Sequence, residues 1–192
     1  MKDARVVQRQ AVLAVGSNLG DRLDILQGGV DAIEGIEGVR LTRVSPVYET
    51  IPVGGPPQPD YLNAVVLAEV SIPSLDLLDR LHDVEAAFDR VRVVRWGPRT
   101  LDIDIITVAG EHSDDPELTL PHPRAHERAF VLAPWHDVDQ NAVLPGYGRV
   151  ADLLAVADQT GIRRSVMPLV LQEAESVLPR GDDPPRPPRQ KS

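Results

Sequence analysis

"LDIDII", residues 101–106, alternates apolar and acidic residues with a period of two, which is typical of a β-strand. Successive side chains of a strand point to opposite faces, so Leu101, Ile103 and Ile105 share one face and can fill a core. Asp102 and Asp104 share the other face, with Cα atoms about 6–7 Å apart. Two like charges held this close are costly unless a cation or a proton compensates them. The segment therefore predicts a buried strand with an acid pair on one side.

This acid pair has two interpretations. A hard divalent cation with oxygen ligands, such as Mg²⁺, would compensate the charges. The alternative is a solvent-facing strand edge that carries ordinary acids, and the pair alone does not decide between the two. The preceding residues favour the metal, because four arginines lie within ten positions although the chain carries a net charge of −9. They are Arg90, Arg92, Arg95 and Arg99.

Guanidinium groups bind phosphate oxygens in a bidentate manner. Acids for Mg²⁺ beside arginines for phosphate are the usual equipment of phosphoryl transfer. Taken singly, each arginine fits equally well in a weak surface ion pair. The combination, rather than any one residue, indicates a phosphoryl-transfer site.

The composition is that of an ordinary globular protein, with 192 residues, 42% hydrophobic and 26% charged. Without cysteine there is no disulfide framework, thiolate nucleophile or cysteine-bound zinc, which fits a reducing compartment. We find neither the apolar core of a signal peptide at the N-terminus nor an apolar run of membrane-spanning length. The net charge of −9 argues against a general nucleic-acid binder. We therefore expect a cytoplasmic monomer with neither a membrane nor a nucleic-acid partner.

The first half of the chain reads as strand, helix and two strands. A buried strand at 11–16 leads into the turn "GSNLGD", where Ser17, Asn18 and Asp21 are possible helix caps. This turn lacks the lysine and the spacing of a P-loop, but it can line a pocket. The later expected elements are a helix at 23–36, a strand at 39–50, a proline- and glycine-rich loop at 51–60 and a strand at 61–70. In the strand at 39–50, Val39 and Leu41 share one side, and Arg43 is a further candidate for that side.

The second half is expected to contain a helix at 74–90, whose apolar face is Leu75, Leu78, Val84, Ala87 and Phe88. The remaining expected elements are an arginine-rich loop at 89–99, a strand at 101–108, a polar turn at 109–117, a helical stretch near 124–133 and a helix near 149–157. Residues 179–192 hold five prolines and no large apolar residue, so we expect a disordered tail. A single domain then covers residues 1–178.

This order, strand–helix–strand–strand–helix–strand, matches the split βαβ or ferredoxin-like plan. The predicted fold class is thus α+β, an antiparallel sheet with helices packed on it. Since that fold supports many functions, the function has to be inferred from the site.

Several further residues are candidates for a binding site. Tyr61 and Asn63 lie two apart at a strand start, and can offer a stacking ring and an amide that reads a heterocycle, or simply end a strand. Trp96 can flank a ring or fill the core. His122 and His126 mimic a zinc pair by spacing, but Pro123 and the missing HExxH motif argue against zinc.

Five segments together resemble the 6-hydroxymethyl-7,8-dihydropterin pyrophosphokinase family. They are "GSNLGDR", "SPVYET", "QPDYLNAVV", "RWGPRTLDIDI" and "LPHPRAHERAFVLAP", and they follow in the family's order across roughly residues 11–154. The resemblance implies transfer of the β,γ-pyrophosphoryl group of ATP to the hydroxymethyl group of the pterin, with release of AMP, in folate biosynthesis. It also implies two Mg²⁺ ions as cofactors.

By the resemblance, Asp102 and Asp104 are the ligands of the two magnesium ions, and Arg90 and Arg92 belong to a loop that closes on the reacting phosphates. The residues that match ATP-binding positions are Glu85, Arg95, Arg99, Ile105, Thr119, His122 and Arg128. The residues that match pterin-binding positions are Tyr61 and Phe130, whose rings sandwich the pterin, Asn63, which reads its edge, and Asn18, Thr50, Val53 and Trp96.

Two alternatives remain at this point. One is another magnesium-dependent phosphoryl or nucleotidyl transferase that uses the same acids and arginines. The other is a non-catalytic ferredoxin-like ligand-binding domain, which would need no acid pair beside an arginine loop.

Overall fold

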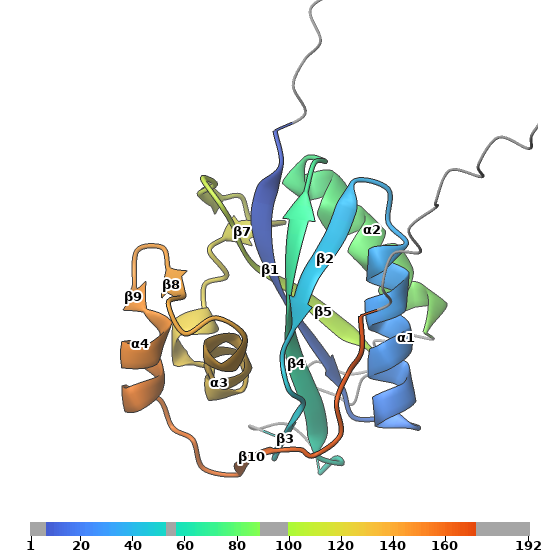
Figure 1. The fold of residues 1–192 in the computed structure, drawn as a ribbon, viewed down its shortest axis with the longest axis vertical. Coiled ribbons are helices and arrows are strands. Elements are labelled where there is room, and N and C mark those ends of the chain that lie inside the picture. The colour runs from blue at the N-terminus through green and yellow to red at the C-terminus, as the bar shows by residue number, and fades with distance from the viewer. Residues whose placement is uncertain (1–6, 53–56, 89–99, 172–192) are drawn as a thin grey trace, which may run out of the picture.

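The computed structural model describes residues 7–52, 57–88 and 100–171 of the chain (Figure 1). The strands of its main sheet are β1 (Arg9–Ser17), β2 (Val39–Val44), β3 (Tyr48–Thr50), β4 (Tyr61–Val70), β5 (Asp102–Val108) and β10 (Ile162–Arg164). The helices are α1 (Arg22–Glu34), α2 (Ser74–Ala87), α3 (Ala129–Val138) and α4 (Val150–Val156), with a 3₁₀ turn η1 (Ala125–Glu127). Two small hairpins consist of β6 (Ser113–Asp114) with β7 (Thr119–Leu120) and β8 (Val143–Leu144) with β9 (Gly148–Arg149).

All neighbouring strands of the main sheet are antiparallel, in the order β10–β3–β4–β1–β5, and β2 also pairs with β4. Helix α1 joins β1 to β2, two strands that β4 separates in the sheet. Helix α2 joins β4 to β5, which β1 separates. The predicted α+β class and antiparallel sheet are therefore confirmed.

The predicted strand at 39–50 is interrupted. Pro46 has no N–H to donate to a ladder, and the chain leaves the strand between β2 and β3. Ser45 keeps the contact with β4, because its N–H donates to the Val65 carbonyl and its hydroxyl accepts from the Val65 N–H. A register shift after Leu41 turns Arg43 to solvent, so the suggestion that Arg43 shares the face of Val39 and Leu41 was wrong.

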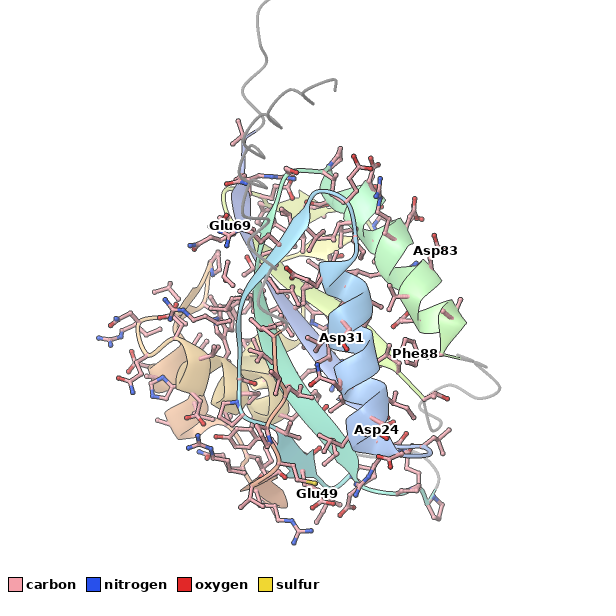
Figure 2. The ribbon with its side chains drawn as sticks, turned by 45° about the vertical axis from the view of Figure 1, so that its right-hand side comes forward. Asp24, Asp31, Glu49, Glu69, Asp83 and Phe88 are labelled. Atoms are coloured by element: carbon pink, nitrogen blue, oxygen red, sulfur yellow. The ribbon has the colours of Figure 1, made fainter. Side chains whose placement is uncertain are left out.

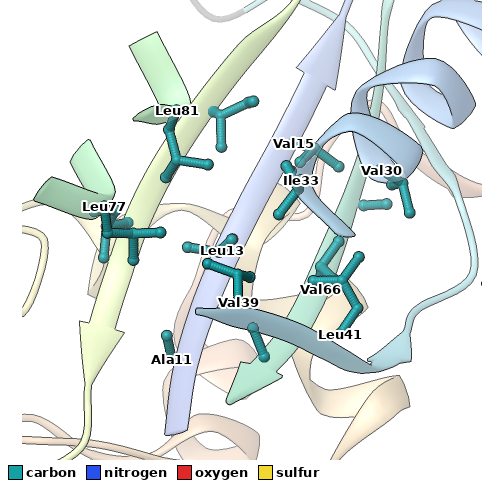
Figure 3. Close-up of a cluster of buried hydrophobic side chains, with 14 of the residues drawn as sticks. Ala11, Leu13, Val15, Val30, Ile33, Val39, Leu41, Val66, Leu77 and Leu81 are labelled. Atoms are coloured by element: carbon teal, nitrogen blue, oxygen red, sulfur yellow. The ribbon is translucent and has the colours of Figure 1, made fainter. Parts of the chain in front are cut away.

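Helices cover the two faces of the sheet differently (Figure 1). On one face, Leu13 and Val15 of β1 pack with residues of α1 and α2, such as Ile33 and Leu77 (Figure 3). On the other face, Val12 packs with α3 and α4 residues such as Leu132. The alternation of side chains along β1 therefore serves two separate apolar clusters.

The buried face of α2 is Ser74, Leu77, Leu78, Leu81 and Glu85. The prediction was wrong for Leu75, which is 46% exposed, and for Ala87, which is also exposed. The apolar residues alone do not identify the buried face of α2. Glu85 is on that face, at a position where periodicity predicts an apolar residue. What this carboxylate does is described with the site.

Two glycines of α1 allow close packing of α1 against α2 and β5. A Cβ atom added to Gly28 would lie 3.0 Å from the ring of Phe88, and one added to Gly29 would lie 2.9 Å from Leu101. Figure 2 shows Phe88 at the end of α2, beside α1. Glycine is unfavourable inside a helix, but these two glycines are the residues that bring α1 close to its neighbours.

The C-terminal part differs from the prediction in its boundaries. The helical stretch expected near 124–133 is a 3₁₀ turn followed by α3, and the helix expected near 149–157 is α4. Strand β10 and the two hairpins were not predicted. Among the described residues, none of the helices combines the length and apolar composition that a membrane span requires. The predicted tail at 179–192 lies outside the described residues.

Candidate active site

The α3-facing side of the sheet carries a row of polar side chains beyond the end of the apolar cluster. Gly16 of β1 lies between Asn63 of β4 and Asp102 of β5. In the next row, Ala14 lies between Val65 and Asp104. Because side chains two apart share a face, both aspartates and Asn63 lie on the same side of the sheet. The prediction that Asp102 and Asp104 share a face is confirmed by the neighbours of β5, since Ile103 and Ile105 are buried in the opposite cluster.

Asp104 lies within reach of two basic side chains. Arg128, which lies just before α3, donates from Nη1 to Asp104 Oδ2 over 3.0 Å. The His122 Nε2 atom lies 3.9 Å from the same oxygen. The Arg128 guanidinium also lies 5.5 Å from the centre of the Phe130 ring, within the range of a cation–π contact. Asp104 therefore has a cationic partner in this structure.

The environment of His122 favours its neutral form. Burial is the main cause that lowers the pKa of His122, and Arg128 acts in the same direction, while Asp104 opposes them. The Nδ1 atom accepts from the Arg124 N–H over 3.1 Å. In the neutral ring the proton is then on Nε2, the nitrogen that faces Asp104. His122 is thus arranged as a neutral hydrogen-bond donor beside the acid pair.

The other end of the row holds the residues that were predicted to bind a ring. Asn63 is buried, and its Nδ2 donates to the Thr50 hydroxyl over 2.7 Å. The Tyr61 hydroxyl donates to Gln58 Oε1 over 3.2 Å, and Asn18 Nδ2 donates to the same oxygen over 3.1 Å. The structure therefore brings Asn18, Thr50, Tyr61 and Asn63 together, and it adds Gln58, which sequence reasoning missed.

A shallow hollow of about 360 Å³ opens next to this end. It is lined by Asn18, Leu19, Gly20, Arg22, Glu49, Pro59 and Asp60. The turn "GSNLGD" thus lines a pocket, as predicted. Asp21 is the residue of this turn that caps α1, accepting from the Asp24 N–H over 3.3 Å.

Helix α2 contacts the backbone of the acid-bearing strand β5. The fully buried Glu85 carboxylate accepts from the Ile103 N–H over 2.7 Å. Ile103 lies between Asp102 and Asp104, so Glu85 fixes the backbone from which both acids project. This contact with the strand is a role that the sequence did not predict for Glu85.

Two other residues matched to ATP-binding positions have protein contacts in this structure. The Ile105 side chain lies in the core on the face opposite the acids, so a nucleotide on the acid face can reach its backbone but not its side chain. Thr119 in β7 donates from its hydroxyl to the Asp115 carbonyl over 3.0 Å. Of the ATP-matched residues that the structure describes, His122 and Arg128 lie beside Asp104.

Six predicted site residues lie outside the described residues. They are Val53, Arg90, Arg92, Arg95, Trp96 and Arg99. Their roles remain the predictions made above.

The acid pair resembles the protein part of a magnesium site rather than a site in which side chains alone surround the metal. Within the described ranges, no three histidine or acidic side chains gather closely enough to hold a metal alone. Mg²⁺ usually keeps several waters and binds one or two carboxylates together with substrate phosphates. Asp102 and Asp104 supply two carboxylates on a rigid strand, which is the protein share of such a site.

The fold and the site define an α+β protein whose antiparallel sheet presents paired carboxylates and a buried amide on one face, with a guanidinium from the start of α3 beside them. The family model of 7,8-dihydro-6-hydroxymethylpterin-pyrophosphokinase (HPPK) matches residues 12–140, and the chain belongs to this family.

Curated relatives carry the corresponding name. The chain is 40% identical over 159 residues to the 2-amino-4-hydroxy-6-hydroxymethyldihydropteridine pyrophosphokinase of Pseudomonas aeruginosa, covering 83% of this chain and 98% of the relative. It is 43% identical over 193 residues to the enzyme of that name from Mycobacterium leprae, covering 90% of this chain and 99% of the relative.

Solved structures agree in fold. An HPPK-DHPS structure in complex with substrates aligns with a TM-score of 0.63 at 12% identity, covering 82% of this chain and 48% of that chain. Wild-type HPPK-DHPS of Plasmodium falciparum, solved with pterin and p-hydroxybenzoate, aligns with a TM-score of 0.57 at 14% identity, covering 82% of this chain and 45% of that one. The chain thus spans less than half of these larger proteins, and at this identity the likeness concerns the fold alone.

Proposed function

We propose that this protein transfers the pyrophosphoryl group of ATP to the hydroxymethyl group of 6-hydroxymethyl-7,8-dihydropterin and releases AMP, as a step of folate biosynthesis. Membership of the pyrophosphokinase family supports this reaction. The structural observation that carries it is the row Asn63–Gly16–Asp102 across the sheet. It puts a group suited to a heterocycle one strand away from a group suited to a phosphate-bound cation, with only the backbone of Gly16 between them.

The core of the fold is, in this proposal, a ferredoxin-like split βαβ unit. The order β5–β1–β4–β2 with antiparallel neighbours supports it. So do α1 and α2, each of which joins two strands across an intervening one, and both of which pack on the same face (Figure 1). The opposite face is left for the site and for α3.

Asp102 and Asp104 are proposed to hold Mg²⁺, two ions when ATP is bound. Bound magnesium would neutralise and polarise the phosphate oxygens of the triphosphate. The chain's own contribution is to fix the two carboxylates, through the ladder with β1 and through the bond from Ile103 to Glu85. A rigid pair loses little entropy when the cations arrive.

Arg128 and His122 are proposed to contact the triphosphate. Arg128 can exchange its bond with Asp104 for phosphate oxygens once cations neutralise the acid, since guanidinium groups suit both partners. His122 can donate from Nε2 without carrying a charge. Arg90, Arg92, Arg95 and Arg99 would complete the positive surroundings of the reacting phosphates. Thr119 and the backbone of Ile105 would border the nucleotide, whereas the buried Glu85 would act through its bond to Ile103.

The pterin is proposed to stack between Tyr61 and Phe130 while Asn63 reads its edge, with Asn18, Thr50, Val53 and Trp96 around it. The bond from Asn63 to Thr50 fixes the orientation of the amide before a ligand binds. A ring held in this way presents its hydroxyl for in-line attack on the β-phosphorus of ATP, and positioning of this kind can supply much of the rate.

The test is an analysis of the nucleotide products. The protein is incubated with ATP, Mg²⁺ and 6-hydroxymethyl-7,8-dihydropterin, and the nucleotides and pterins are separated by chromatography. Pterin-dependent AMP, together with a pterin that gains two phosphates, is the expected result. ADP or free pyrophosphate would identify a different transferase, and intact ATP would identify a binding domain.

A further inference from the structure

Gly16 lies near the C-terminal end of β1, at a position that is paired on both sides and where glycine is normally unfavourable. It pairs with β4 on one side and with β5 on the other. It is not among the glycines with positive φ, so its backbone conformation is one that other residues adopt. A glycine within a strand often marks a place where another group approaches the backbone closely.

The side chains of β1 that face α3 become smaller along the strand. Val12 lies in the apolar cluster under α3, Ala14 packs at its border, and Gly16 follows where the polar row begins. The sheet surface thus becomes lowest between Asn63 and Asp102. This is the place where the proposed pterin site meets the proposed metal site.

The space above Gly16 is occupied by the amide of Asn63. A Cβ atom at position 16 would lie 2.9 Å from Asn63 Oδ1, which is closer than real Cβ contacts, and 3.9 Å from Tyr61 Cδ1. The other end of the amide is tied to Thr50 by the 2.7 Å bond from Nδ2. The amide therefore lies between the Thr50 hydroxyl and the bare backbone of Gly16, and any side chain at position 16 would displace it.

We propose that Gly16 is a positioning residue that sets the orientation of the Asn63 amide and thereby the selectivity for the pterin ring. Glycine at this position serves ligand recognition rather than folding. This inference rests on the proposed function, because it assumes that Asn63 reads the pterin.

The test is Gly16→Ala, with steady-state kinetics for each substrate. The added methyl group should rotate the Asn63 amide away from Thr50. We expect KM for the pterin to rise on the order of tenfold to a hundredfold, since small misplacements of a positioning group have effects of this size. KM for ATP should stay unchanged, and the melting temperature should not fall, because alanine suits a strand better than glycine.

A double-mutant cycle shows whether Gly16 acts through Asn63. Asn63→Ala should itself raise KM for the pterin, and adding Gly16→Ala to it should have little further effect. Gly35→Ala is the matched control, since Gly35 ends α1 away from the site and a Cβ there comes no closer than 3.4 Å to another atom. It should leave both KM values unchanged.

Three outcomes would overturn the inference. An unchanged KM for the pterin would show that position 16 does not affect recognition, additive effects in the cycle would show that it does not act through Asn63, and an unfolded Gly16→Ala variant would assign the glycine to folding. A wild-type protein that makes no pterin-dependent AMP would instead refute the proposed function, so the two failures are distinguishable.

Discussion

At the scale of single residues, the site depends on the alternation of side chains along β5. Ile103 and Ile105 are each 4% exposed and anchor the strand, while Asp102 and Asp104 project from its other face. The acids are therefore held by neighbours that have no chemical role of their own. The residues that stabilise the strand are therefore different from the residues that are available for binding.

Asp102→Asn and Asp104→Asn should each lower kcat at least about a hundredfold, because charge stabilisation at the reacting group is lost. Both variants should remain folded, since the core residues of β5 are unchanged. The measurements are AMP formation and a thermal melt. Asp83→Asn, on the outer side of α2, is the control and should behave like the wild type (Figure 2). If the aspartate variants unfold and the wild type is active without magnesium, the acid pair has a structural role and does not bind a metal.

At the scale of elements, a polar contact inside the core joins helix α2 to strand β5. Glu85 is fully buried and accepts the Ile103 N–H. A buried N–H that loses its acceptor costs about 1–3 kcal/mol. The helix that follows β4, the strand proposed to bind the pterin, is therefore also the support of the acid-bearing strand.

Glu85→Leu should lower the melting temperature and raise the Mg²⁺ concentration needed for half-maximal activity, because the strand between the two acids loses its support. Glu85→Gln keeps an acceptor oxygen and should retain more of both properties. The comparison is made by thermal melts and by magnesium titration of AMP formation. Equal behaviour of the two variants would contradict a role of the bond to Ile103.

The edge of the sheet is held by a second polar contact. Glu49 of β3 accepts from Arg163 of β10 over 2.6 and 3.0 Å and from Arg22 of α1 over 3.1 Å. The hydrogen bonds from Arg163 are the main cause that lowers the pKa of Glu49, and those from Arg22 add to it. Three elements thus meet at one carboxylate.

A lowered pKa means that the folded state binds a proton less readily than the unfolded state. The stabilisation by Glu49 is then fully present above its ordinary pKa of 4.5 and is lost as the pH falls below that value. Glu49→Gln should therefore melt below the wild type at pH 7, and the difference should shrink in acid. Glu117→Gln, at an exposed position, is the control. A difference that is independent of pH would show that the charge of Glu49 is not involved.

At the scale of the whole molecule, the sheet divides two tasks between its faces. One face is covered by α1 and α2 and carries most of the core, whereas α3 covers only part of the other (Figure 1). The site lies where the sheet continues beyond α3. Binding at such a place requires no rearrangement of the core.

Magnesium and ATP together should therefore stabilise the folded protein as a ligand of the native state. At a ligand concentration a hundred times Kd, the free energy of unfolding rises by about 2.7 kcal/mol. For a chain of this size that corresponds to a rise in melting temperature of about 5–10 °C. Chelation of magnesium, or Asp104→Asn, should remove most of the rise. A full rise without magnesium would show that the acids do not serve a cation.

Much of this arrangement is predictable from the sequence. The period of two in "LDIDII" places the acids on one face, and the spacing of Tyr61 and Asn63 places ring and amide on one face. The order of strands and helices predicts an α+β protein with an antiparallel sheet. Each of these follows from local periodicity, which depends only on backbone geometry and is therefore written in consecutive residues.

The tertiary structure alone decided which residues are neighbours across strands. Asn63, Gly16 and Asp102 form one row because of the register of three strands, and Arg128 meets Asp104 because α3 packs on that face. The inward position of Glu85 and the addition of β10 likewise depend on partners distant in the chain. Strand register and helix rotation are set by the packing of whole surfaces, and no short stretch of sequence contains that information.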